Sequence, residues 1–163
     1  MQTATSDIYK QNAFNYRERG WACVLPLPPG QKFPPPNGRS GYDGVEPDDA
    51  QIEQWRAEKP DGNIALVMPD TVVGIDVDAH DGKRGEETFK AAQARFGPLP
   101  ATWTSTARGV ASPSRHYFFR VPAGAKLEST LEVDGQSNVE SIQRYRRKLW
   151  MSPWHENAAY LPP

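Results

Sequence analysis

The segment Val72–Asp78 limits the fold of this chain more than any other stretch, because apolar and polar residues alternate along it. β-branched residues in such an alternation predict a half-buried β-strand. One face of this strand is expected to meet a core and carries Val73, Ile75 and Val77. The opposite face carries Gly74, Asp76 and Asp78, and neighbouring side chains on one face of a strand lie roughly 6 to 7 Å apart.

The two acids of this strand indicate a particular chemistry. Carboxylates side by side repel each other and cost desolvation free energy unless water or a cation compensates them. Mg²⁺ or Mn²⁺ is the usual compensator, and two such ions about 3.5 to 4 Å apart serve nucleotidyl or phosphoryl transfer. Asp76 and Asp78 therefore favour metal-dependent phosphate chemistry. The alternative is a solvated strand end whose acids only protect a sheet edge.

Composition narrows the class of protein. A chain of 163 residues is expected to form one domain with a real core. The single cysteine, Cys23, excludes an internal disulfide and favours a reducing compartment. No apolar stretch reaches membrane-spanning length, so we expect a cytoplasmic protein with no membrane partner. The net charge is −1, but the stretch between Thr88 and Leu127 holds basic residues and no acid, so a polyanion could bind there.

Periodicity and turn residues predict alternating helices and strands. The expected helices cover residues 6–19, 47–59 and 85–96, and the expected strands cover 21–27, 63–68, 71–78, 102–106, 115–121, 139–143 and 148–152. We expect the strands 63–68 and 71–78 to pair through the tight turn Pro69-Asp70. The proline-rich stretch 28–38 must be a loop, because proline removes hydrogen-bond donors and fixes φ.

A second group of polar residues lies in the strand expected at 115–121. Period two places Ser114, His116, Phe118 and Arg120 on one face. A hydroxyl and an imidazole at the start of a strand could donate hydrogen bonds to phosphate oxygens. The alternative for His116 is a packed, hydrogen-bonded structural residue.

A third signal is Glu140, which shares a strand face with Ile142. An acid beside an apolar partner invites a metal or a cationic neighbour. The basic cluster at 144–148 follows as the turn into the next strand. Such a turn can equally be a solvated hairpin tip without a partner.

Together and in this order, these segments resemble the prim-pol domain of the archaeo-eukaryotic primase superfamily. Such domains are the bifunctional primase/polymerase modules of plasmid, phage and prophage replication proteins. The matching features are the strand Trp21–Leu27 with Pro29–Pro34 after it, the pair Asp76 and Asp78, the segment Ser114–His116, and Glu140 with the basic turn, Ser152–His155 and Tyr160 after it. The resemblance covers nearly the whole chain.

The resemblance implies roles for single residues. Asp76, Asp78 and Glu140 match the three metal-binding, catalytic carboxylates of the family. The residues that match nucleotide-binding or primer-binding positions are Ser114, His116, Lys32 and Arg147. The loop before His116 departs from the family pattern, because it is usually rich in glycine and here reads 108–113 as Arg-Gly-Val-Ala-Ser-Pro.

The resemblance also implies a fold and a function. We expect an α+β fold in which an RRM-like antiparallel sheet carries the acids and an N-terminal α/β module packs beside it. The function would be template-dependent nucleotidyl transfer with two Mg²⁺ or Mn²⁺ ions. Its partners would be a single-stranded DNA template, a primer, and ribonucleoside or deoxyribonucleoside triphosphates. We expect residues 1–163 to be one catalytic core from a longer replication protein, in which a helicase domain often follows. A phage-encoded protein would act in the host cytoplasm.

Three rival functions use some of the same residues. A two-metal nuclease would degrade a labelled strand instead of extending it. A glycosyltransferase with an Asp-x-Asp metal site would turn over a nucleotide sugar and normally needs a larger domain. A non-catalytic RRM-like module would bind nucleic acid through stacking aromatic residues and would not need Asp76 or Asp78.

Overall fold

The computed structural model describes residues 7–41, 43–144, 149–151 and 159–161. The helices among them are α1 (Ile8–Glu18), α2 (Asp49–Glu58) and α3 (Gly85–Phe96). The strands are β1 (Cys23–Leu27), β2 (Asn63–Val67), β3 (Val72–Val77), β4 (Thr104–Thr106), β5 (Arg115–Arg120), β6 (Thr130–Val133), β7 (Gln136–Ile142), β8 (Leu149–Met151) and β9 (Ala159–Leu161). None of the helices in this part of the chain is long and apolar enough to cross a bilayer.

The strands form two antiparallel sheets. The smaller sheet has the order β1-β2-β8, and the larger has the order β6-β7-β3-β5-β4-β9. Helices and antiparallel sheets in one chain confirm the α+β class. The RRM-like description of the larger sheet stays a prediction, since this sheet has six strands and an RRM sheet has four.

The expected hairpin between residues 63–68 and 71–78 is wrong. β2 pairs with β1 and β8, whereas β3 pairs with β5 and β7 in the other sheet. The burial of the two strands explains the difference. All five residues of β2 are buried, whereas half of the six residues of β3, Asp76 among them, are only half-buried. A strand covered on both faces and a strand with an open acidic face fit different sheets, and the chain crosses from one sheet to the other at 68–71.

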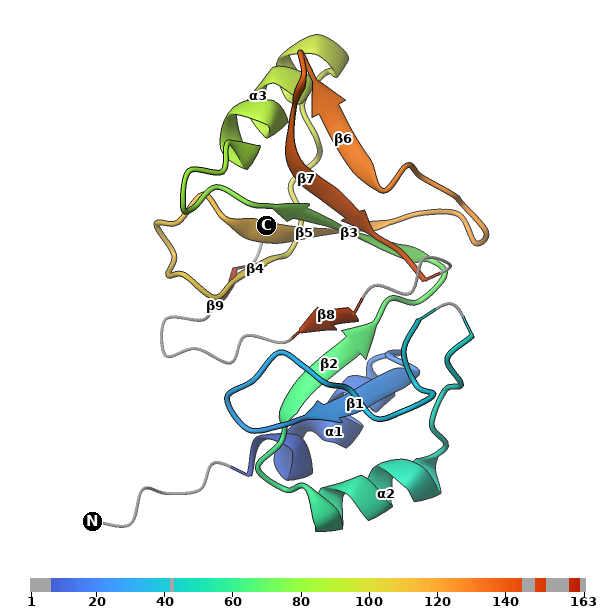
Figure 1. Ribbon diagram of the computed structural model, residues 1–163. Coiled ribbons are helices and arrows are strands. Elements are labelled where there is room, and N and C mark those ends of the chain that lie inside the picture. Colours follow the sequence, from blue (N-terminus) through green and yellow to red (C-terminus); the bar gives the residue numbers. More distant parts are fainter. Residues whose placement is uncertain (1–6, 42, 145–148, 152–158, 162–163) are drawn as a thin grey trace, which may run out of the picture.

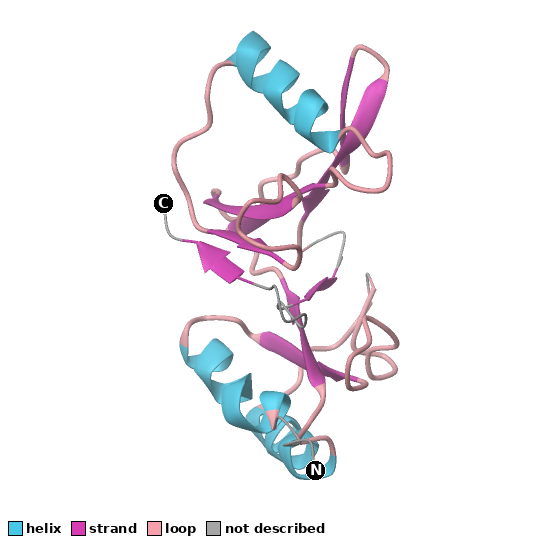
Figure 2. Cartoon of the chain, turned by 90° about the vertical axis from the view of Figure 1, so that its left-hand side faces the viewer, coloured by secondary structure: helices cyan, strands magenta, loops and turns pink. Residues whose placement is uncertain are grey.

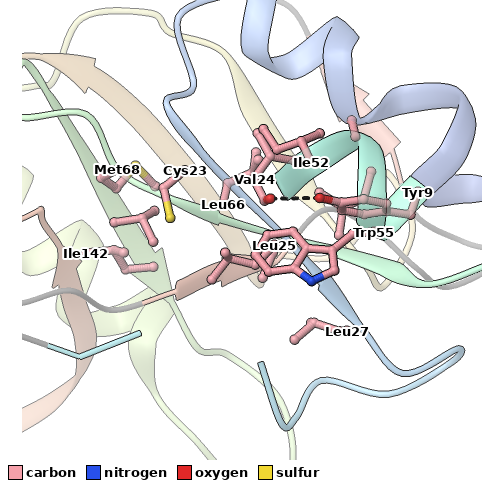
Figure 3. Close-up of a cluster of buried hydrophobic side chains, with 14 residues drawn as sticks. Tyr9, Cys23, Val24, Leu25, Leu27, Ile52, Trp55, Leu66, Met68 and Ile142 are labelled. Atoms are coloured by element: carbon pink, nitrogen blue, oxygen red, sulfur yellow. Dashed lines mark hydrogen bonds between the residues drawn. The ribbon is translucent and has the colours of Figure 1, made fainter. Parts of the chain in front are cut away.

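An N-terminal lobe contains α1, α2 and the smaller sheet. The side chain of Asp48 caps α2 by accepting a hydrogen bond from the backbone N–H of Gln51 at 2.8 Å. The two helices pack on strands β1 and β2 around a cluster of buried side chains (Figure 3). Within this cluster, the buried Tyr9 hydroxyl donates a hydrogen bond of 2.9 Å to the carbonyl oxygen of Val24 (Figure 3). Helix α1 is thereby tied to β1, an edge strand of the smaller sheet.

The larger sheet and α3 form the second lobe, as Figure 2 shows. Helix α3 covers one face of the sheet, where the Phe89 and Tyr117 ring centroids lie 4.9 Å apart. The opposite face turns toward the N-terminal lobe (Figure 1). The buried side chains of Met68 and Ile142 meet there over Gly74, and Val72 and Phe118 pack against the same cluster. This contact covers one end of the face.

Candidate functional site

The predicted polar residues of the larger sheet lie in one row across three strands. In the register of the sheet, Asp76 on β3 is directly opposite Glu140 on β7 and His116 on β5. Directly paired residues of an antiparallel sheet share a face, and their Cβ atoms lie about 4.5 to 5.5 Å apart. Asp76 is two residues after Gly74, so the row begins where the contact between the lobes ends.

Asp78 follows β3 and is held by its backbone and by its carboxylate. Its N–H donates a hydrogen bond of 2.9 Å to the carbonyl oxygen of Asn138. Its carboxylate lies 2.5 Å from the Lys83 Nζ atom and 3.1 Å from the His80 Nε2 atom. Burial alone would raise the pKa of Asp78, but Lys83 and His80 together hold it below its ordinary value. Asp78 is therefore a carboxylate kept in the charged form.

Lys83 brings a positive charge to all three predicted metal-binding acids. The hydrogen bond to Asp78 raises the pKa of the Lys83 ammonium against the opposing effect of desolvation. The charges of Asp78, Asp76 and Glu140 raise this pKa further. An ammonium at this place offsets the repulsion among the carboxylates, which is the work expected of a bound cation.

His116 lies between an acid and a hydroxyl. Its Nε2 atom is 3.3 Å from the Oδ1 atom of Asp76, and its Nδ1 atom is 3.5 Å from the Oγ atom of Ser105 on β4. Ser105 is buried, with 1% of its surface exposed, so its hydroxyl cannot reach a substrate and serves to orient the imidazole. His116 itself is only partly buried and lies on the open face.

Comparison with known protein families gives a match over most of the chain. The model of the family "Bifunctional DNA primase/polymerase, N-terminal", called Prim-Pol, matches residues 13–153 of the 163. The chain belongs to the Prim-Pol family. A search of curated proteins finds no match to it.

Two other predicted nucleotide-binding residues of this Prim-Pol domain, Ser114 and Lys32, do not join the row. The Oγ atom of Ser114 accepts a hydrogen bond of 2.9 Å from the backbone N–H of Ala79, so it anchors the loop after Asp78. Lys32 lies in the loop between β1 and α2, next to Gln31, whose carbonyl oxygen binds the Asn63 amide at the start of β2. Arg147 and the segment Ser152–His155 lie outside the described residues. Roles in nucleotide binding stay predictions for these residues.

Three side chains of the site were not predicted from the sequence. Lys83 and His80 belong to the loop that follows Asp78, within residues 76–83, which read Asp-Val-Asp-Ala-His-Asp-Gly-Lys. Such a run of charged and imidazole side chains directly after a strand was the sequence signal that could have identified Lys83 and His80. Ser105 carried none, because only the pairing of β4 with β5 brings it to His116.

The donor atoms of this Prim-Pol domain suit a hard divalent cation. Asp76, Asp78 and Glu140 supply carboxylate oxygens, which Mg²⁺ and Mn²⁺ prefer. Within the described part of the chain, no group of three or more acidic, histidine or cysteine side chains is gathered closely enough to hold a metal ion, so the acids are in an open arrangement. We infer that the ion pair between Lys83 and Asp78 contributes to this open arrangement, because the Asp78 carboxylate already has the Lys83 ammonium as its cation.

Proposed function

We propose that this Prim-Pol domain is a metal-dependent nucleotidyltransferase that extends a primer on a DNA template. Membership of a primase/polymerase family supports this activity in general terms. The observation that carries the specific proposal is the row Glu140, Asp76 and His116 on one open sheet face, with Lys83 beside the acids. In this row the carboxylates of Asp76 and Glu140 would bind cations, and the imidazole of His116 would bind a phosphate group.

The proposed roles follow from the contacts of each group. Asp76, Asp78 and Glu140 would hold the divalent cations. Cations bound at such a site lower the pKa of an attacking hydroxyl and offset the charge of a triphosphate and its leaving pyrophosphate. His116, oriented by Ser105, would donate a hydrogen bond to a phosphate oxygen of the incoming nucleotide. Lys83 would leave Asp78 when the cation binds and turn its ammonium to the phosphates.

A primer-extension experiment tests the proposal. The purified chain is mixed with a labelled primer on a longer DNA template, ribonucleotides or deoxyribonucleotides, and Mg²⁺ or Mn²⁺. We expect the primer to lengthen, and Asp76→Asn to slow this at least 100-fold. The control is Glu132→Gln, which removes an exposed acid of β6 outside the row and should leave the rate unchanged.

The same gel separates the rival functions. Shortening of the labelled strand that needs Asp76 would establish a nuclease and contradict the proposal. Binding of the DNA without any change in its length, under every metal and nucleotide tested, would establish a non-catalytic binding module. Either result leaves family membership intact and overturns the nucleotidyltransferase proposal.

A further inference from the structure

A groove of about 1120 Å³ lies between the two lobes at the end of the sheet face away from the acids. One wall comes from the end of α1 and the turn after it, with Tyr16, Arg19 and Trp21. The other wall comes from β5 and the segment before β4, with Trp103, Phe118 and Arg120. A pocket for a small ligand usually measures about 300 to 1,000 Å³, so this groove has room for an elongated ligand.

The lining of the groove combines aromatic rings with positive charge. Five of its thirteen lining residues are aromatic, two are arginines, and none is acidic. The indole of Trp103 is 57% exposed although large apolar side chains are usually covered. Arg19 and Arg120 are both exposed. Unpaired bases stack on aromatic rings while arginines neutralise phosphates, so this chemistry matches a single nucleic-acid strand.

The groove also continues toward the candidate active site. Phe118 follows His116 by two positions on the same face of β5, and their ring centroids are 6.4 Å apart. The His116 ring in turn lies 3.3 Å from Asp76. A strand that stacks on Trp103 and Phe118 would therefore be led along β5 toward the carboxylates. A duplex would not fit this description, because its base faces are already stacked.

We propose that this groove binds single-stranded DNA and delivers it to the row of acids. The inference deepens the proposed function and rests on it in one respect, namely that the bound strand would be the template. Strand binding by itself needs neither a metal ion nor a nucleotide. It can therefore be measured apart from catalysis.

The test is a binding titration of a fluorescent oligothymidylate of 12 nucleotides in the presence of EDTA. The groove variant is Trp103→Ala with Arg120→Gln. The matched control is Phe96→Ala with Arg95→Gln, which removes an exposed ring and an exposed arginine from the end of α3, outside the groove. We expect the groove variant to bind at least 10-fold more weakly and the control to stay within 2-fold of the parent chain.

Salt dependence gives a second readout that loss of folding would not imitate. For a single strand, each lost phosphate contact makes the negative slope of log K against log[salt] less steep by about 0.7. Arg120→Gln alone should show this change with an unaltered melting temperature, because the side chain is exposed.

Several results would overturn the groove proposal. They are equal affinity of parent and groove variant for the oligonucleotide, equal affinity of the parent for a duplex of the same length, and stronger binding of a proline-rich peptide than of DNA. A parent chain that binds the strand through the groove but never extends a primer would instead contradict only the proposed function.

Discussion

Lys83 is the residue that changes the interpretation of the acids most. A strand with Asp76 and Asp78 on one face needs a compensating cation, and the Lys83 ammonium supplies one. If the acids hold a divalent ion as proposed, that ion would have to displace the Lys83 ammonium from Asp78. Metal affinity would then depend on this lysine as well as on the carboxylates.

Replacing Lys83 with methionine should strengthen metal binding. The variant keeps an unbranched side chain only one atom shorter and removes its charge, so Asp78 becomes available and a divalent ion no longer displaces an ammonium. We expect the dissociation constant for Mn²⁺ to fall about 3- to 10-fold, equivalent to about 1 kcal/mol. Lys90→Met is the control, because Lys90 pairs with Glu86 on α3. Unchanged Mn²⁺ affinity in Lys83→Met would show that the ammonium does not compete.

The contacts of Asp78 also predict how stability depends on pH. Its pKa is below the ordinary value of 3.8 in the folded chain, so the folded state binds fewer protons than the unfolded state. The stabilising contribution is thus present above pH 3.8 and is lost as the pH falls through the folded pKa. In EDTA, the melting temperature of Asp78→Asn should lie below that of the parent at pH 6, and the gap should close below pH 4.

The exposed acid Asp70, in the turn before β3, provides the control for this pH series. Asp70→Asn should melt at nearly the parent temperature at every pH. A gap for Asp78→Asn that stays constant from pH 6 to pH 2.5 would contradict the assignment, because a constant gap cannot come from a change of protonation.

At the scale of elements, the start of α3 is fixed to the ends of β3 and β7. The Gly85 N–H donates a hydrogen bond of 2.8 Å to the Asp78 carbonyl oxygen. A methyl group at Gly85 would overlap the backbone oxygens of Asp78 and Asn138. The first turn of α3 can approach the two strands only because this residue has no side chain.

Gly85→Ala should therefore destabilise the larger lobe. Backbone atoms cannot give way as a flexible side chain can, so we expect the free energy of unfolding in urea to fall by about 1 to 3 kcal/mol. Glu87→Ala, at an exposed position of the same helical turn, should stay within about 0.5 kcal/mol of the parent. A Gly85→Ala variant as stable as Glu87→Ala would mean that α3 does not rest on these strand ends.

The elements that the sequence predicted well are those with a strong local pattern. The expected helix 85–96 matches α3, and the alternation in β3 placed Val73 and Val77 in the core. The pairing of strands was harder, because it is a choice among distant segments. β2 does not pair with β3, its close neighbour in the sequence, and Ser105 reaches His116 only through the pairing of β4 with β5. Strands β6 and β9 had no predicted counterpart.

At the scale of the whole molecule, an apolar contact around Met68 joins the two lobes. Met68 is fully buried at the end of β2, and its Cε atom lies 2.9 Å from the position that a Cβ atom would take at Gly74. Ile142 and Phe118 complete the contact from β7 and β5. The acids lie immediately beyond it, so the packing of the lobes sets the environment of the candidate site.

Met68→Ala should weaken the molecule as a whole. The lost side chain leaves a cavity between the lobes, and truncations of this kind cost about 2 to 5 kcal/mol of unfolding free energy. The chain should still unfold in one transition, at a lower urea concentration and seen equally by fluorescence and circular dichroism. Two separated transitions in the parent chain would show that the lobes fold independently and would contradict this account.

Binding of Mn²⁺ by the purified chain, followed by electron paramagnetic resonance, tests the central claim that Asp76, Asp78 and Glu140 form one cation site. We expect the parent chain to bind Mn²⁺ and Asp76→Asn, Asp78→Asn and Glu140→Gln each to weaken binding at least 10-fold. Glu132→Gln should leave it unchanged, because Glu132 lies outside the row. Equal Mn²⁺ affinity in the parent and in Asp76→Asn would contradict the claim.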